Sequence, residues 1–205
     1  MDGSCKPFIK VLKSAGIKDL EAEKNYIEIK KPLRFINKEK GIEIIALPAD
    51  HYSITSMIDY DSPVLGKQFA KLDKIEDFEK EIASSRTFCF LHELEFLAQN
   101  ELIKGGDLSN AIVVVDEVIE KERLSEIAKL LGKPSVEVNK EGILNNIKLR
   151  HANEPARHKL LDIVGDLTLV GRPIKGKIIA SKPGHGPNTE FARLIKKSIK
   201  EIENQ

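Results

Sequence analysis

The chain has 205 residues, of which 41% are hydrophobic and 32% are charged, and its formal net charge is +1. This composition is typical of a globular protein that can bury a core. The chain lacks the excess of positive charge that attracts nucleic acid. Its two cysteines are too few for a disulfide framework or a thiolate zinc site. No apolar run is long enough to span a bilayer and the first residues lack a signal-peptide pattern, so we expect a cytoplasmic protein with no transmembrane segment.

The first part of the chain predicts one short helix followed by strands. Residues 7–15 are amphipathic and precede Gly16, which predicts a helix that needs a surface to pack on. The pattern of apolar and polar residues then predicts strands at 26–30, 42–47 and 52–60.

The rest of the chain alternates helices and strands. A helix is predicted at 75–82, and residues 87–115 predict a strand–helix–strand unit. The later elements are a helix at 120–131, a short strand at 134–138, a helix at 155–170, a strand at 175–180, a turn at 182–188 and a basic helix from residue 189. This order favours an α+β fold, namely a two-layer sandwich of a mixed or antiparallel sheet against helices, with a βαβ insertion.

The most informative segment lies in the predicted helix at 155–170. His158, Asp162 and Asp166 recur every four residues, so on a helix they form one stripe with about one turn between neighbours. A histidine and a carboxylate at this spacing can direct two donor atoms at one cation. On spacing alone, however, such a stripe is more often a solvated helix face than a metal site, so the pattern by itself leaves both interpretations open.

Six short segments, taken together and in order, give this stripe a context. They are Met1-Asp2-Gly3-Ser4, Met57-Ile58-Asp59-Tyr60, Ser85-Arg86-Thr87-Phe88, Gly105-Gly106-Asp107, the stripe segment from His158 to Asp166, and Gly184-His185-Gly186-Pro187-Asn188. The set resembles the zinc-dependent UDP-3-O-acyl-N-acetylglucosamine deacetylases of lipid A biosynthesis. The residues from Asn153 to His158 resemble the Bacteroidetes-type branch, some members of which are fused to a dehydratase.

The resemblance implies two related α+β domains with the active site between them. Residues 1–20 would hold the last helix of a first domain and residues 21–205 would form the second, with an insertion at 87–115 as the passage for the acyl chain. The first domain would supply a Glu-His pair, in which the histidine is the third zinc ligand and the glutamate is the general base. We therefore expect this chain to work only with that domain, in cis or in trans.

The implied function is that of a zinc-dependent hydrolase that removes the N-acetyl group from UDP-3-O-(3-hydroxyacyl)-N-acetylglucosamine. His158 and Asp162 would bind zinc, which gives hydroxide from its bound water near neutral pH. His185 would act as general acid or oxyanion stabiliser, and Asp166 would orient its imidazole. The residues implied in substrate binding are Lys159 near the phosphates or sugar, Thr87 and Phe88 along the sugar and acyl chain, Asp59 and Tyr60 at the uridine, and Leu94, Gly106 and Val113 in the acyl passage.

Three alternatives stay open at the level of the sequence. Without the resemblance, His185 is an ordinary turn histidine, and the three residues assigned to the acyl passage are ordinary core. The whole chain is alternatively a non-catalytic half-protein that binds the nucleotide sugar or pairs with a separately encoded first domain. Three further histidines have no matching context and are expected at the surface; they are His51, His92 and His151.

Overall fold

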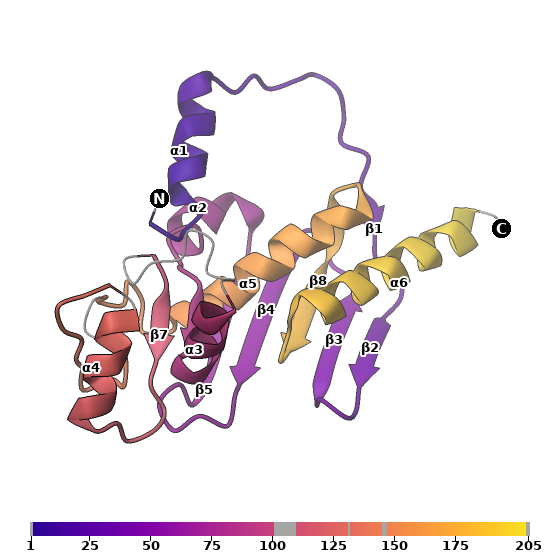
Figure 1. Cartoon of the computed structure of the whole chain (residues 1–205). Helices are drawn as coiled ribbons and strands as arrows, with labels where there is room; N and C mark the ends of the chain where they lie inside the picture. The colour runs from indigo at the N-terminus through magenta and orange to yellow at the C-terminus, as the bar shows by residue number, and fades with distance from the viewer. Residues whose placement is uncertain (1, 101–109, 131, 145–146, 204–205) are drawn as a thin grey trace.

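A six-stranded mixed sheet forms the centre of the fold, for which a computed structural model describes residues 2–100, 110–130, 132–144 and 147–203 (Figure 1). The strands are β1 (Ile27–Glu28), β2 (Leu33–Asn37), β3 (Ile42–Leu47), β4 (Tyr52–Asp59), β5 (Lys67–Leu72) and β8 (Ile174–Ser181). Five of them lie in the order β2-β3-β8-β4-β5, and β1 pairs with the first part of β8. β8 is parallel to β4 and β1, whereas the other pairs are antiparallel.

Two long helices cover one face of this sheet. They are α5 (Glu154–Leu167), which continues into the 3-10 turn η2 (Thr168–Val170), and α6 (His185–Glu203). Figure 1 shows them lying across the sheet, and they pack against each other. In the chain, β8 connects α5 to α6. This arrangement confirms the predicted two-layer α+β architecture with a mixed sheet.

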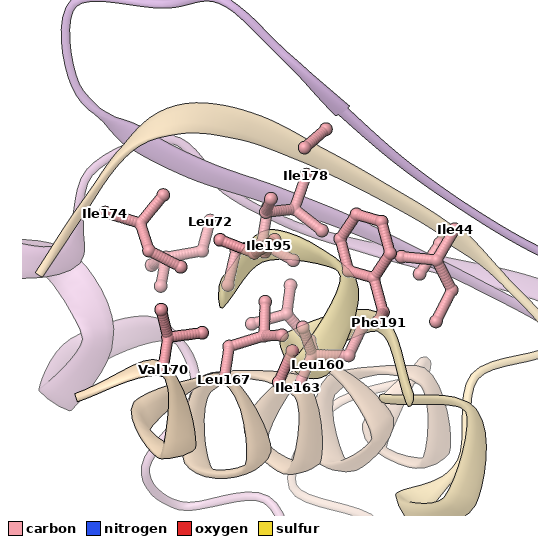
Figure 2. Close-up of a cluster of buried hydrophobic side chains, with 14 of the residues drawn as sticks. Ile44, Leu72, Leu160, Ile163, Leu167, Val170, Ile174, Ile178, Phe191 and Ile195 are labelled. Carbon is pink, nitrogen blue, oxygen red and sulfur yellow. The ribbon is translucent and has the colours of Figure 1, made fainter. Parts of the chain in front are cut away.

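The main core lies between the sheet and these two helices. The strand register places Ala46, Ile178, Ile54 and Leu72 in one buried row that crosses β3, β8, β4 and β5. The helices cover this row with buried apolar side chains, namely Leu160, Ile163 and Leu167 of α5 and Phe191 and Ile195 of α6 (Figure 2). Each such side chain contributes about 1.5–3 kcal/mol through its burial, so this layer holds α5 firmly on the sheet.

The segment between β5 and α5 begins with η1 (Ile75–Asp77) and α2 (Phe78–Glu81), where Phe78 and the following Ile82 pack in the main core. The elements after them form a smaller unit with apolar clusters of its own; they are β6 (Phe88–Phe90), α3 (Leu91–Gln99), β7 (Ile112–Val114) and α4 (Lys121–Leu130). Because β6 and β7 are parallel and α3 lies in the connection between them, the predicted βαβ insertion is confirmed.

The N-terminal helix α1 (Lys6–Ala15) is held mainly at its ends. The backbone N–H of Lys6 donates to the carbonyl of Ala83, and Lys13 pairs with Glu79. The helix has no buried residue, although its Phe8, Val11 and Leu12 are apolar. Among all helices in the described part of the chain, none combines the length and the apolar character needed to cross a membrane.

The structure differs from the sequence-based prediction at four elements. β2 and β5 were not predicted, because charged side chains interrupt their apolar pattern. The strand predicted at 134–138 is wrong: the described residues there form only a single bridge, between Val138 and Leu144. The last helix begins at His185 rather than at residue 189.

The packing of α5 predicts a large effect at Leu160, which is 0% exposed. We expect Leu160→Ala to lower the free energy of unfolding by about 2–5 kcal/mol, because it removes apolar contacts and leaves a cavity against the sheet. Leu169→Ala is the matched control, since Leu169 is 59% exposed and its loss should change stability by less than about 0.5 kcal/mol. Urea denaturation of both variants measures the difference, and equal stabilities would contradict this account of the core.

Candidate active site

The start of α5 is set by its sequence and determines where the stripe of His158, Asp162 and Asp166 lies. Glu154 is the first helical residue and is followed by a proline, which is favoured in a first turn because its missing N–H needs no helical partner there. The apolar face of α5 packs on the sheet. The stripe is thereby left on the flank of α5 that meets the first turn of α6.

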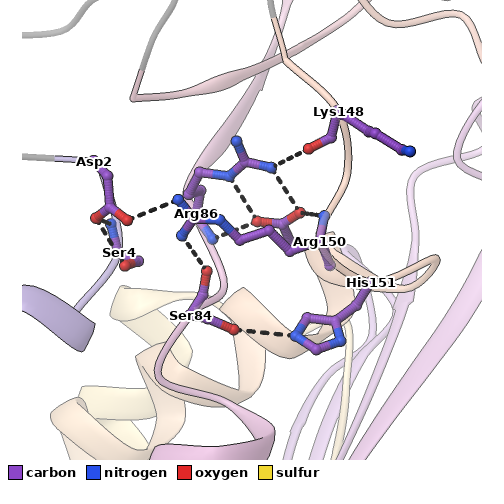
Figure 3. A network of polar contacts seen from close by, with 8 residues as sticks. Asp2, Ser4, Ser84, Arg86, Lys148, Arg150 and His151 are labelled. Atoms are coloured by element: carbon purple, nitrogen blue, oxygen red, sulfur yellow. Dashed lines mark hydrogen bonds and ion pairs between the residues drawn. The ribbon is translucent and has the colours of Figure 1, made fainter.

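A buried ion pair fixes this helix start. Glu154 is 0% exposed, and Arg86 donates to both of its carboxylate oxygens, from Nε at 2.8 Å and from Nη2 at 3.0 Å. The backbone N–H groups of Arg86 and Arg150 donate to the same carboxylate at 3.0 and 2.7 Å, and Nη2 of Arg86 also donates to the carbonyl of Lys148 (Figure 3). Burial favours a higher pKa for Glu154, but these hydrogen bonds outweigh it and lower the pKa, so the carboxylate stays ionised.

Arg150 extends this network toward the N-terminal segment. Its guanidinium donates to the carbonyl of Ser84 and pairs with Asp2, both at 2.7 Å, while the hydroxyl of Ser84 lies 3.1 Å from Nε2 of His151 (Figure 3). Burial, followed by the nearby arginines, lowers the pKa of His151. His151 is half-buried, whereas the sequence predicted it at the surface. The two other histidines expected at the surface, His51 and His92, are exposed.

His158 and Asp162 converge as a pair of metal ligands would. Nε2 of His158 lies 3.5 Å from Oδ1 of Asp162, and the two side chains are only 15% and 7% exposed. Burial lowers the pKa of His158, and the Asp162 carboxylate opposes this shift without reversing it. The imidazole is therefore neutral at pH 7, which is the form that binds metals.

The separation of these two donor atoms fits zinc. Zn–N and Zn–O bonds of about 2.0–2.2 Å at a tetrahedral angle place two donors about 3.4 Å apart, and the observed Nε2–Oδ1 distance is 3.5 Å. Across the residues that the structure describes, no group of three or more His, Cys, Asp or Glu side chains is arranged to hold a metal. His158 and Asp162 by themselves would account for two of the three protein ligands that catalytic zinc sites typically use.

Lys159 links this pair to an aromatic cluster. Its Nζ lies 2.9 Å from Oδ2 of Asp162 and 5.6 Å from the centre of the Phe88 ring. Tyr60 packs edge-on against Phe88 with their ring centres 5.6 Å apart. Thr87 precedes Phe88 and is exposed. The structure therefore brings three of the predicted substrate residues, Lys159, Phe88 and Tyr60, together beside Asp162.

Asp59 ends β4 beside Tyr60 and lies among cations. Its Oδ2 is 3.7 Å from Nζ of Lys67 and 3.8 Å from Nζ of Lys182, and its Oδ1 accepts a hydrogen bond from the backbone N–H of Asp61 at 3.2 Å. That backbone hydrogen bond first, and the two lysines after it, lower the pKa of Asp59. The sequence did not reveal Lys182, because β4 and β8 are far apart in the chain.

The backbone at Lys182 is also unusual. Its φ of 51° is left-handed, which residues other than glycine rarely adopt. Such strain is concentrated at functional sites. A lysine just before Pro183-Gly184-His185 is the only local signal for it in the sequence.

His185 meets Asp166, but it does so from a helix. The predicted turn at 182–188 is wrong in its second half, because α6 begins at His185 and its first turn tolerates Pro187. Nδ1 of His185 lies 3.0 Å from Oδ2 and 3.1 Å from Oδ1 of Asp166, and its Nε2 lies 4.0 Å from Oδ2 of Asp162. The side chain of His185 is 71% exposed, so a ligand can reach it.

The residues predicted to line an acyl passage lie in the small unit. Leu94 and Val113 are both buried in its apolar cluster, together with Leu91 and Val115. The structure thus places them in a core, and their contact with an acyl chain stays a prediction. Gly106, the third residue of this set, lies outside the described residues.

Comparison with known proteins gives this geometry a family context. The chain matches the family described as "LpxC: UDP-3-O-acyl N-acetylglycosamine deacetylase" over residues 1–129 and 131–197. It is 43% identical to the "Bifunctional enzyme LpxC/FabZ" of Porphyromonas gingivalis, covering 100% of this chain and 44% of that protein. It is 45% identical to the protein of the same name from Chlorobaculum tepidum, covering 96% of this chain and 43% of that protein.

A shorter relative shows similar coverage. The chain is 36% identical to the "UDP-3-O-acyl-N-acetylglucosamine deacetylase" of Syntrophotalea carbinolica, covering 95% of this chain and 55% of that protein. The chain therefore spans about half the length of the curated relatives it matches.

The buried Arg86–Glu154 pair predicts a defined dependence of stability on pH. Because the pKa of Glu154 is lowered from its ordinary 4.5 in the folded state, the pair stabilises the fold fully above pH 4.5, and this contribution is lost as the pH falls through the lower, folded pKa. We expect Glu154→Gln to lower the free energy of unfolding at pH 7 by about 3–5 kcal/mol, since Arg86 is left buried without a counter-charge.

Chemical denaturation between pH 3 and 7 measures this effect. The loss caused by Glu154→Gln should shrink as the pH falls below 4.5. Glu126→Gln, which removes one partner of an exposed ion pair with Arg123, serves as the control and should change stability by less than about 1 kcal/mol. A loss at Glu154 that is the same at pH 3 and pH 7 would contradict the assignment of an ionised carboxylate.

Proposed function

The chain belongs to the UDP-3-O-acyl N-acetylglycosamine deacetylase family (LpxC), and from this premise we propose that it supplies one half of a zinc-dependent amide hydrolase. The substrate proposed is UDP-3-O-(3-hydroxyacyl)-N-acetylglucosamine of lipid A biosynthesis, which loses its N-acetyl group as acetate. The observation that carries the proposal is the convergence of His158 with Asp162, and of His185 with Asp166, on one flank of α5. The small number of cysteines supports a cytoplasmic location.

His158 and Asp162 are the proposed zinc ligands from this chain. A bound zinc ion supplies a water nucleophile near neutral pH, by lowering the pKa of that water to about 7, and polarises the acetyl carbonyl. The burial that keeps His158 neutral leaves its lone pair available for a metal. Lys159 lies beside Asp162, where its positive charge also favours the phosphates or the sugar of the substrate.

His185 and Asp166 are proposed to deliver the proton that the departing amine requires. Cleavage of the acetamide C–N bond requires a proton on the departing amine and positive charge near the carbonyl oxygen. Nδ1 of His185 donates to Asp166, which leaves Nε2 on the side of Asp162, where the reacting amide would lie. Asp166 thereby orients the imidazole.

The aromatic cluster and its neighbours are proposed to hold the rest of the substrate. Tyr60 presents a half-exposed ring that can stack on uridine, and Asp59 beside it can accept hydrogen bonds from the base or ribose. Thr87 and Phe88 would contact the sugar and the start of the acyl chain. The acyl passage is proposed to run along residues 87–115 of the small unit, with Leu94, Gly106 and Val113 in its lining.

A complete site is proposed to need a first domain that carries a Glu-His pair. Residues 1–20 are assigned to the end of that domain and residues 21–205 to the second domain. The N-terminal segment supports this division because its apolar residues are exposed: Phe8 52%, Val11 65%, Leu12 64%, Ile17 70% and Leu20 76%. Such a surface is typical of an interface that another element covers.

A second candidate function follows from the same observation. Within the described ranges the chain offers only a two-residue metal pair, so a non-catalytic half-protein that binds the nucleotide sugar is the alternative. Mixing the chain with the separately produced first half of the Porphyromonas gingivalis relative separates the two. Turnover favours a split or fragmented enzyme, whereas binding of the nucleotide sugar without turnover favours the alternative.

Replacement of one residue in each pair tests the proposed roles. With the Glu-His half supplied in cis or in trans, we expect Asp162→Ala to abolish both zinc retention and deacetylation, because the metal loses a ligand. His185→Ala should retain zinc but lower kcat by about 10²–10⁴-fold, because a general acid is lost. Zinc content by mass spectrometry and acetate release measure the two effects.

Two exposed residues provide matched controls. His51 is an exposed histidine and Asp73 is an exposed aspartate that pairs with Lys71 at 2.6 Å, so alanine at either position should leave zinc and kcat unchanged. Retention of zinc and turnover in Asp162→Ala would exclude Asp162 as a ligand. A wild-type rate in His185→Ala would remove His185 from the mechanism.

A further inference from the structure

Asn188 is a buried polar residue that contacts Asp166 at this site. It lies in the first turn of α6 and is 1% exposed. Its side-chain Nδ2 donates to Oδ2 of Asp166 at 2.8 Å. Its backbone N–H donates to the carbonyl of Gly184 at 2.9 Å, which closes the first turn of the helix.

The spacing of Asn188 and His185 lets both side chains contact Asp166. Residues three apart on a helix lie on the same face, and both of these side chains reach the carboxylate of Asp166. Asp166 therefore accepts one hydrogen bond from an exposed imidazole and one from a buried amide. Two donors from different directions restrict the rotation of the carboxylate more than one donor does.

The orientation of the Asn188 amide is determined by its partner. An ionised carboxylate has no hydrogen to donate, so the NH₂ group must face Asp166. Oδ1 then points the other way, where it is buried without a hydrogen-bond partner among the described residues. An unpaired buried acceptor destabilises the fold, so an apolar side chain would suit a purely structural role better. The presence of an amide is explained by its bond to Asp166.

His185 depends on Asp166 for its orientation. Its side chain is 71% exposed, so packing holds it only weakly. We propose that Asn188 is a positioning residue, which locks the Asp166 carboxylate so that His185 keeps its proton on Nδ1 and directs Nε2 toward the reacting amide. This inference rests on the proposed deacetylase function, and its test includes a measurement that does not require turnover.

The test combines Asn188→Leu, which approximates the shape of the side chain, with Asn188→Ala, which adds no atoms if leucine does not fit. With the Glu-His half supplied, we expect either variant to lower kcat by about 10–100-fold, as loss of an orienting partner does, with little change in KM and zinc content. The thermal midpoint of Asn188→Leu should change little, because loss of the unpaired Oδ1 offsets loss of the bond. In an Asp166→Ala background the same variants should change kcat by less than about twofold, since the two residues act as a unit.

Nitrogen-15 NMR of the chain without zinc provides the second measurement. We expect the Nδ1–H tautomer of neutral His185 to be less populated in both Asn188 variants than in the wild type. Ser56→Ala is the matched control, because Ser56 is 0% exposed and its Oγ is also buried without a partner, yet it lies on β4; it should change neither kcat nor the tautomer.

The outcomes separate this inference from the proposed function. An unchanged kcat, or an equal loss of kcat with and without Asp166, would overturn the positioning role. Absence of deacetylation in the wild type would refute the proposed function instead, and the tautomer measurement would then decide the positioning role alone. An unchanged tautomer in that case overturns it, and a shifted tautomer supports it.

Discussion

The buried ion pair between Arg86 and Glu154 holds α5 and the small unit in a fixed relative position. Arg86 lies just before β6 and Glu154 begins α5, so the pair joins two segments that are 68 residues apart in the chain. A charge left alone in this interior is strongly unfavourable, so neither segment can shift without the other. The positions of His158, one turn after Glu154, and of Phe88, two residues after Arg86, both follow from this contact.

The sequence predicted the strands that are buried and missed those at the edges of the sheet. The central strands β3, β4 and β8 are rich in isoleucine and have a neighbouring strand on both sides. Their patterns of apolar residues are therefore clear in the sequence. β2 and β5 are the two edge strands, and their exposed positions carry charged residues such as Arg34 and Lys71. Charged residues protect an edge from unwanted pairing, and the same residues conceal the strand in the sequence.

The candidate site was predictable where its residues share one helix. The stripe of His158, Asp162 and Asp166 was visible because its spacing is local, and its expected roles came from the family resemblance. The contact between Asp59 and Lys182 depends on the pairing of β4 with β8 and leaves no local pattern. The start of α6 was missed because glycine and proline near His185 usually indicate a turn. In this chain the same residues form a first helical turn, and this turn is what brings His185 to Asp166.

The stripe on α5 also rotates along the helix. An α-helix has 3.6 residues per turn, so each step of four residues turns about 40° beyond a full turn, and two steps turn about 80°. His158 and Asp162 are one step apart and still converge, whereas Asp166 has rotated away from them and meets α6 instead. A regular repeat in the sequence thus forms two groups of contacts in space, the His158–Asp162 pair and the contacts of Asp166 with α6. The helix itself divides the proposed ligation from the proposed proton transfer, with no loop needed between them.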